Sequence, residues 1–140
     1  MFDKQLLYIL TILEAVEKIR IYTTEFSDPL DFFEANAQMN FNATVNLLIA
    51  IGEESKKIDD AKKETLPDIW WSSIIGLRNE LSHNYRGIDY HIIWNVVQVH
   101  LDKIKIACVA ILLQLDIEEK ILKEAVTSRY YEHLAYILDE

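Results

Sequence analysis

Residues 3–24, DKQLLYILTILEAVEKIRIYTT, indicate the fold class of this chain. Apolar side chains recur in this stretch at intervals of three and four residues, which places them on one face of an α-helix. A strand would instead alternate apolar and polar positions. The stretch therefore predicts a first amphipathic helix. Its apolar positions are Leu6, Leu10, Leu13, Val16 and Ile19.

Four further helices are predicted downstream of this stretch. Ser27–Pro29 ends the first helix, because proline disfavours helical geometry in the residue before it, and Ser or Asp can cap the helix that follows. A second helix is expected from about Asp31 to Ile58. A third is expected from Pro67, which is tolerated in a first turn, to His83. A fourth, capped by Asp89, runs to about Leu115, and a last helix begins near Ile117.

Length and composition agree with a helical bundle. The chain has 140 residues and only 3 Gly and 2 Pro, too few turn residues for a many-stranded protein. The polar stretch from Asp59 to Thr65 is expected to end the second helix. We expect a single all-α domain over residues 1–140. It is an up-and-down bundle of four long helices, with a core from about residue 3 to 115 and a C-terminal helix over about 117–138.

The sequence does not indicate a membrane protein or a disulfide-stabilised protein. No apolar run approaches the roughly 18 uncharged residues of a membrane span, and charges such as Asp3 and Lys4 make the first segment unlike a secretory signal. We therefore expect a cytoplasmic protein. Cys108 is the single cysteine, which excludes an internal disulfide, and it falls in an apolar helical stretch. It is predicted to pack in the core.

The charge balance opposes non-specific attraction to nucleic acid. The chain carries 14 Lys and Arg against 23 Asp and Glu, a net charge of −9. Net charge does not describe a local cleft, however, and a dimer brings basic side chains of two chains together. The acidic composition therefore leaves RNA possible as a partner.

The residues with the most chemical potential lie in WWSSIIGLRNELSHNY, residues 70–85. Asn79 and His83 are four residues apart and share one face of the predicted third helix, whereas Arg78 lies about 100° round the helix. The opposite side of the helix should face the core. Its apolar residues are Ile74, Leu77 and Leu81.

These side chains suit cleavage of an RNA phosphodiester bond. Histidine titrates near neutrality and can act as base or acid, and the guanidinium of Arg78 matches phosphate oxygens. Asn79 can bond the phosphate or orient His83. A plainer interpretation also stays open, in which the histidine caps helix carbonyls and the arginine pairs with a carboxylate. Because one chain supplies one copy of each group, an isologous dimer that juxtaposes the third helices would complete the site.

The chain resembles the HepT family of HEPN proteins, the toxin half of the HepT and MntA toxin–antitoxin systems. The family signature is Arg, four residues, His, one residue and Tyr, which residues 78–85 match in full. Ile51–Glu53, Pro67–Trp70 and Gly76 are also similar to the family, and the resemblance covers roughly residues 3–115.

This resemblance implies a metal-independent endoribonuclease that needs no cofactor, forms a homodimer and acts on RNA, with tRNA the leading candidate. It implies that Arg78 and His83 are catalytic and that Asn79 supports them. It further implies a type VII-like antitoxin, an MntA-like minimal nucleotidyltransferase that transfers AMP from ATP to Tyr85. AMP there would add bulk and negative charge beside the catalytic pair and silence it.

Glu53 and three further histidines are other candidate functional residues. Glu53 could be a general base, but we predict that it supports the site by orienting the motif helix. His91, His100 and His133 lack the spacing and cysteine partners of a zinc site, so no metal is assigned.

The three tryptophans have two possible roles. Trp70, Trp71 and Trp94 could stack RNA bases, but core packing or a dimer seam is expected for at least two of them. The second functional hypothesis is a non-catalytic HEPN module that binds nucleotide or serves as an adaptor for a nucleotidyltransferase.

Overall fold

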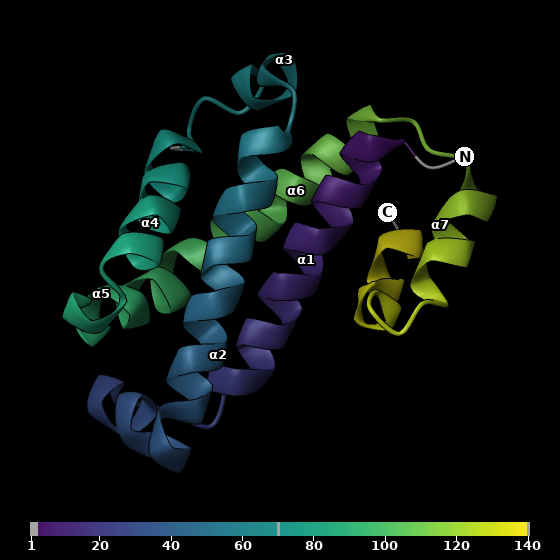
Figure 1. The fold of residues 1–140 in the computed structure, drawn as a ribbon. Helices are drawn as coiled ribbons and strands as arrows, with labels where there is room; N and C mark the ends of the chain where they lie inside the picture. Colours follow the sequence, from purple (N-terminus) through teal and green to yellow (C-terminus); the bar gives the residue numbers. More distant parts are fainter. Residues whose placement is uncertain (1–2, 70, 140) are drawn as a thin grey trace.

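The computed structural model describes residues 3–69 and 71–139, apart from the side chain of Tyr85, and all regular structure within them is helical. The predicted all-α class is confirmed. In Figure 1, α2 lies between α1 and α4, and α6 passes behind them. The elements are α1 (Lys4–Thr23), α2 (Pro29–Lys57), α3 (Asp60–Glu64), α4 (Trp71–His83), η1 (Tyr85–Gly87), α5 (Tyr90–Asn95), η2 (Val96–His100), α6 (Leu101–Gln114), α7 (Glu119–Val126) and η3 (Glu132–Asp139).

Helix α1 is the centre of the core. The Asp3 side chain accepts a hydrogen bond from the Gln5 N–H at 2.7 Å and caps its first turn. The predicted apolar positions are buried, and Ile9, Ile12 and Ala15 between them are buried as well. The helix is therefore enclosed by neighbours on more sides than an ordinary surface helix.

Helix α2 departs from the single continuous helix that the sequence predicts. Asp28 caps it as expected, accepting from the Asp31 N–H at 3.1 Å. Asn36, Ala37 and Gln38 then adopt left-handed φ values of 52°, 55° and 68°, and the helix resumes beyond them. Each non-glycine residue in this region costs about 1–2 kcal/mol.

Side-chain hydrogen bonds hold this left-handed turn. The Asn40 amide donates to the Tyr22 carbonyl at 3.0 Å, and the Asn36 amide donates to Asn40 Oδ1 at 2.8 Å. These two bonds join the turn to the end of α1. Because no glycine or proline marks residues 35–38, propensity offered no signal for the break.

The connection from α2 to α4 confirms one prediction and corrects another. Helix α2 ends at Lys57, just before the polar stretch 59–65 as predicted, and that stretch contains α3, a short helix. Pro67 does not open the next helix, because the Ile69 N–H bonds back to the Leu66 carbonyl at 3.2 Å in a turn, and α4 begins at Trp71. Proline fits a tight turn as well as a first helical turn, so the sequence did not distinguish the two.

The predicted fourth helix is one rod made of α5, η2 and α6. Asp89 caps it as predicted, accepting from the His91 N–H at 2.8 Å. Its middle part, η2, is a π-helical segment that the sequence did not predict. Ile93, Val97 and Leu101 are buried, whereas the neighbouring Ile92 is exposed.

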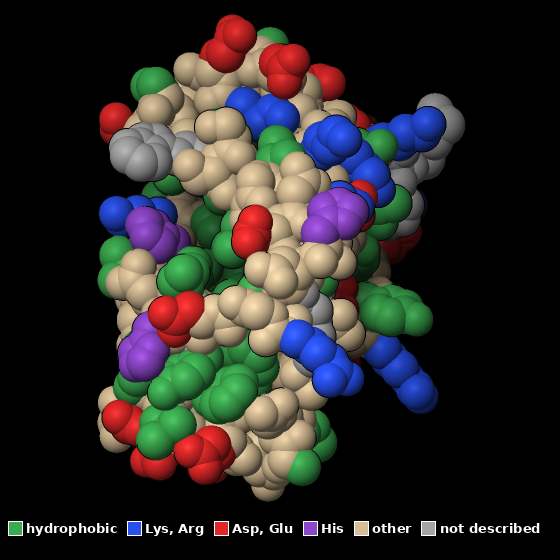
Figure 2. Space-filling view, turned by 60° about the vertical axis from the view of Figure 1, so that its left-hand side comes forward, with side chains coloured by type: hydrophobic (Ala, Val, Ile, Leu, Met, Phe, Trp, Pro, Cys, Tyr) green, Lys and Arg blue, Asp and Glu red, His purple; other side chains and the backbone are tan. Residues whose placement is uncertain are grey.

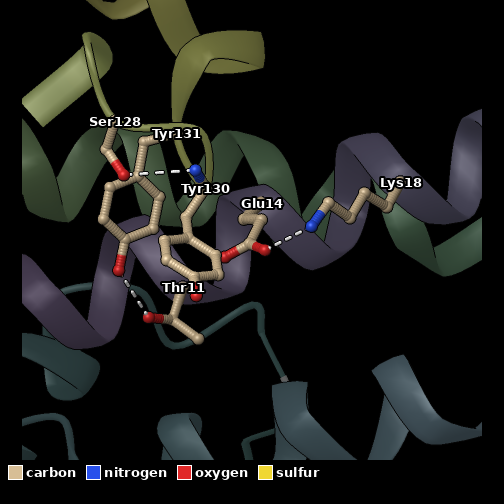
Figure 3. Close-up of polar contacts among 6 residues, drawn as sticks. All are labelled: Thr11, Glu14, Lys18, Ser128, Tyr130 and Tyr131. Atoms are coloured by element: carbon tan, nitrogen blue, oxygen red, sulfur yellow. Dashed lines mark hydrogen bonds and ion pairs between the residues drawn. The ribbon is translucent and has the colours of Figure 1, made fainter.

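The C-terminal segment folds back onto α1. One helix was predicted here, but residues 127–131 form turns that separate α7 from η3. Figure 3 shows the contact with α1, where the Tyr131 and Thr11 hydroxyls share a hydrogen bond of 3.1 Å. Leu134 and Ile137 are buried against the core. The segment therefore packs on the face of α1 that a four-helix arrangement would leave open.

Cys108 is buried in α6 as predicted, and desolvation raises the pKa of its thiol to about 12. Across the described residues, every helix is too short or too polar to cross a bilayer.

Candidate functional site

The site is built where α2 and α4 cross. Gly52 of α2 is buried at the crossing, and a Cβ atom placed there would lie 2.3 Å from Arg78 Cβ and 3.2 Å from the Ile74 carbonyl oxygen. Only a residue without a side chain permits this approach of the two helices. Gly52 therefore allows α2 to lie close against the base of the Arg78 side chain on α4.

Arg78 is held by two polar partners. Its Nη2 forms an ion pair with Glu53 Oε1, and its Nη1 donates to Asn79 Oδ1 at 2.9 Å. The Arg78 and Glu53 side chains are 33% and 37% exposed, so water screens the pair and its contribution to stability is about 0–1 kcal/mol. Its main effect is geometric, because both contacts fix the plane of the guanidinium.

The ion pair between Glu53 and Arg78 is the contact that a supporting role for Glu53 requires. The role itself stays a prediction. Asn79 was expected to bond either a phosphate or His83, and in the structure its amide oxygen accepts from Arg78. The Nε atom of Arg78 is buried without a hydrogen-bond partner among the described residues. The chemically useful donors of Arg78 are therefore those of its two terminal nitrogens.

His83 lies on the outer side of α4. It is exposed, as is Asn79, which shares its helix face as the spacing predicts. Leu81 on the opposite side is buried, and Ile74 and Leu77 are partly buried against the core. The helix thus presents the imidazole to solvent at its last turn, where a substrate can reach it.

Two residues of the motif region fall partly or wholly outside the described structure. The backbone of Tyr85 begins η1, but its side chain lies outside the described residues, so its predicted modification stays a prediction. Trp70 is not described. Trp71 is half-buried, and Trp94 packs on Phe32 with ring centroids 5.6 Å apart, as core packing predicts.

An apolar groove that the sequence analysis missed lies beside the motif helix. It has a volume of about 580 Å³, and its floor includes Leu48 and Ile51 of α2. Leu77 of α4 lines one wall, and Val96 and Ile104 line the other. Figure 2 shows it as a hollow left of centre, where hydrophobic side chains lie below the surrounding surface. Asp68, Ser73, His100 and Lys103 are its polar residues.

A stripe of exposed hydrophobic residues follows the same rod. Val99, Ile106 and Leu113 are 46%, 70% and 58% exposed and recur every seven residues, whereas Ile92, 54% exposed, precedes the π-helical turn, which shifts it to another face. Seven residues is the repeat of a helix that packs along a second helix. This heptad spacing is visible in the sequence.

The described residues offer no group of three His, Cys, Asp or Glu side chains that could hold a metal ion. The side chains present at the site are an arginine with a fixed guanidinium and an exposed histidine on the same helix. A guanidinium binds and neutralises phosphate oxygens, and an imidazole transfers protons near neutral pH.

Comparison with known proteins assigns this chain to a family. The model of the family described as "Ribonuclease HepT-like" matches residues 12–111. A protein of Methanocaldococcus jannaschii named "Putative RNase" is 39% identical over 82 residues, which is 58% of this chain and 75% of that protein. "Probable ribonuclease HepT" of Thermococcus cleftensis is 32% identical over 98 residues, 70% of this chain and 86% of that protein. No solved structure matches significantly. The chain belongs to the HepT-like ribonuclease family.

Proposed function

We propose that this protein is a metal-independent endoribonuclease in which Arg78 and His83 are the catalytic residues. The single observation that supports this most is the Arg78 guanidinium, which Glu53 and Asn79 hold beside the exposed face that carries His83. Membership in the HepT-like ribonuclease family supports the same activity. Cytoplasmic RNA is the substrate class, and tRNA is the first substrate to test.

The proposed chemistry needs three tasks. A base removes the proton of the ribose 2′-hydroxyl, a cation stabilises the charge on the phosphate, and an acid protonates the leaving oxygen. His83 performs a proton transfer, and Arg78 binds the phosphate through its terminal nitrogens. Because one chain has one such histidine, the acid and the base come from two copies.

We further propose that the exposed stripe Val99, Ile106 and Leu113 is the seam to the second copy. Its seven-residue repeat fits two packed helices. Three of the four large exposed hydrophobic residues of the rod lie here, whereas the outer face of α4 presents Ser72, Gly76, Asn79 and His83.

Replacing Ile106 with glutamate should convert the dimer to a monomer, because the charge would be buried in the seam without a partner. Sedimentation equilibrium measures the mass in solution, and a cleavage assay measures the rate of RNA cutting. The mass should fall to that of a monomer, and the cleavage rate should fall with it. Ile21→Glu is the matched control, since Ile21 is similarly exposed but lies on α1. A fully dimeric Ile106→Glu protein would show that the seam is elsewhere.

We also propose that the activity is that of a toxin in a type VII-like system, silenced by an MntA-like nucleotidyltransferase. That partner uses ATP to attach AMP to Tyr85. Intact mass spectrometry after co-expression should show additions in whole AMP steps on the wild-type protein and none on Tyr85→Phe. An unmodified protein that its partner nevertheless inhibits would contradict this regulation and indicate steric masking.

The experiment that tests the function is RNA cleavage by purified protein in the presence of a metal chelator. Wild-type protein should cut tRNA or unstructured RNA under these conditions, and variants at the two catalytic positions should not. Protein that binds nucleotide or the partner but never cuts RNA would favour the non-catalytic adaptor.

A further inference from the structure

Three rings form a stack that leads from the core to the surface next to the motif. The Phe33 and Tyr90 rings are stacked with centroids 4.6 Å apart and an interplanar angle of 16°. The Tyr90 and His91 rings are stacked at 4.4 Å and 26°. At its inner end, Phe33 meets Phe41 edge to face at 4.9 Å. The stack is therefore anchored in the core and ends in an imidazole.

His91 is exposed but oriented. Its side chain is 62% exposed, so one face of the ring rests on Tyr90 while much of the remainder is open to solvent. Asp89 Oδ1 accepts from the His91 backbone N–H at 2.8 Å, and it lies 2.9 Å from Nδ1 of the ring. These hydrogen bonds, the backbone one first, lower the pKa of Asp89 and keep it ionised.

Packing alone does not account for this ring. An outermost ring that buries little area contributes little to the core, yet this one is fixed by a stacking partner and a carboxylate. A ring fixed in this way loses little side-chain entropy when a flat ligand stacks on it. It is thus preorganised for a planar partner.

The stack also lies close to the proposed catalytic residues in the chain. Figure 1 shows α5 directly after α4, joined by η1, with the start of α2 below α5. Arg86 in η1 is exposed and lies between His83 and the stack in sequence.

We propose that His91 is a stacking platform for an unpaired nucleobase of the RNA substrate. The base extends the stack Phe33, Tyr90 and His91 by one ring, while Arg86 contacts the backbone of the strand. Aromatic side chains bind single-stranded nucleic acid in this way because every base has a π face. The inference rests on the proposed function and specifies its substrate as RNA with an unstacked base near the cut.

The test measures RNA binding in a His83→Ala background, so that the substrate survives. The probe is a short single-stranded RNA with one 2-aminopurine, titrated by fluorescence, and a fully paired RNA hairpin serves as the comparison ligand. His91→Ala should weaken binding of the single strand about 5- to 100-fold, the usual loss for one stacked base. His91→Phe should retain the affinity and the fluorescence quenching, because it keeps a flat ring.

Each outcome bears on the proposal. Equal affinity of His91→Ala and its parent would overturn the stacking site alone, as would a His91→Phe protein as weak as His91→Ala. If the parent binds no RNA and the wild-type protein cuts none, the proposed function fails and the platform fails with it. Since His91 is exposed, unchanged thermal unfolding should accompany both variants.

Discussion

His83→Ala should lower the rate of RNA cleavage about 100- to 10,000-fold, the usual contribution of a positioned acid or base. Arg78→Ala should cause a similar loss, because the phosphate charge would no longer be neutralised. Arg78→Lys should recover only part of the activity, since an ammonium cannot contact Asn79 and Glu53 as a planar guanidinium does. The measurement is a single-turnover cleavage rate with saturating protein.

His133→Ala is the control for this series. His133 is another exposed histidine, but it lies in η3, and we expect wild-type cleavage from its alanine variant. Circular dichroism should show that every variant keeps its helices. Undiminished cleavage by folded His83→Ala and Arg78→Ala proteins would remove both residues from the catalytic assignment.

Gly52→Ala should damage both the fold and the activity. The new Cβ would lie 2.3 Å from Arg78 Cβ, the rigid base of the side chain, so α2 and α4 must separate. Overpacking of this kind costs about 1–3 kcal/mol, and alanine's better helix propensity returns at most about 1 kcal/mol. A shift of Arg78 by about 1 Å should also reduce cleavage about 100-fold. Urea unfolding and the cleavage assay measure the two effects.

Gly76→Ala is the matched control for the unfolding measurement. Gly76 is also a helical glycine, but a Cβ there meets nothing within 4 Å, so the variant should be about 0.5–1 kcal/mol more stable. The two substitutions therefore have opposite expected signs. A Gly52→Ala protein as stable and active as wild type would show that the helices can separate without moving Arg78.

Local sequence patterns predicted which helices form better than they predicted where those helices begin and end. The apolar spacing of residues 3–24 predicted α1, and Asp89 was correctly predicted as a cap, whereas Ser27 and Asp28 could not be told apart before the structure showed Asp28 to be the cap. The start of α4 was predicted wrongly, because Pro67 suits a turn as well as a first helical turn. The left-handed turn at 35–38 depends on Asn40 reaching the end of α1, a contact between distant segments.

At the site, too, the sequence predicted the helix face of a side chain but not its tertiary partner. Helical periodicity correctly placed Asn79 and His83 on one exposed face and Leu81 in the core. The pairing of Arg78 with Glu53 depends on the close approach of two helices at Gly52, which no spacing within either helix reveals. To predict the tertiary partner of a side chain, one must know where its helix crosses a neighbour. The helix face that the side chain occupies follows from the local period alone.

The π-helical segment η2 makes the rod from α5 to α6 tolerant of a change in length at one place. A π turn holds one residue more than an α turn, so removing one residue from Val96–His100 would let the segment become α-helical while Ile93 and Leu101 keep their places in the core. A residue removed from the middle of α6 would instead turn everything before the cut by about 100°, the rotation per residue of an α-helix, and would pull the ring of Tyr90 away from Phe33. Alignments of relatives should therefore show one-residue gaps at this turn and exclude them from α6.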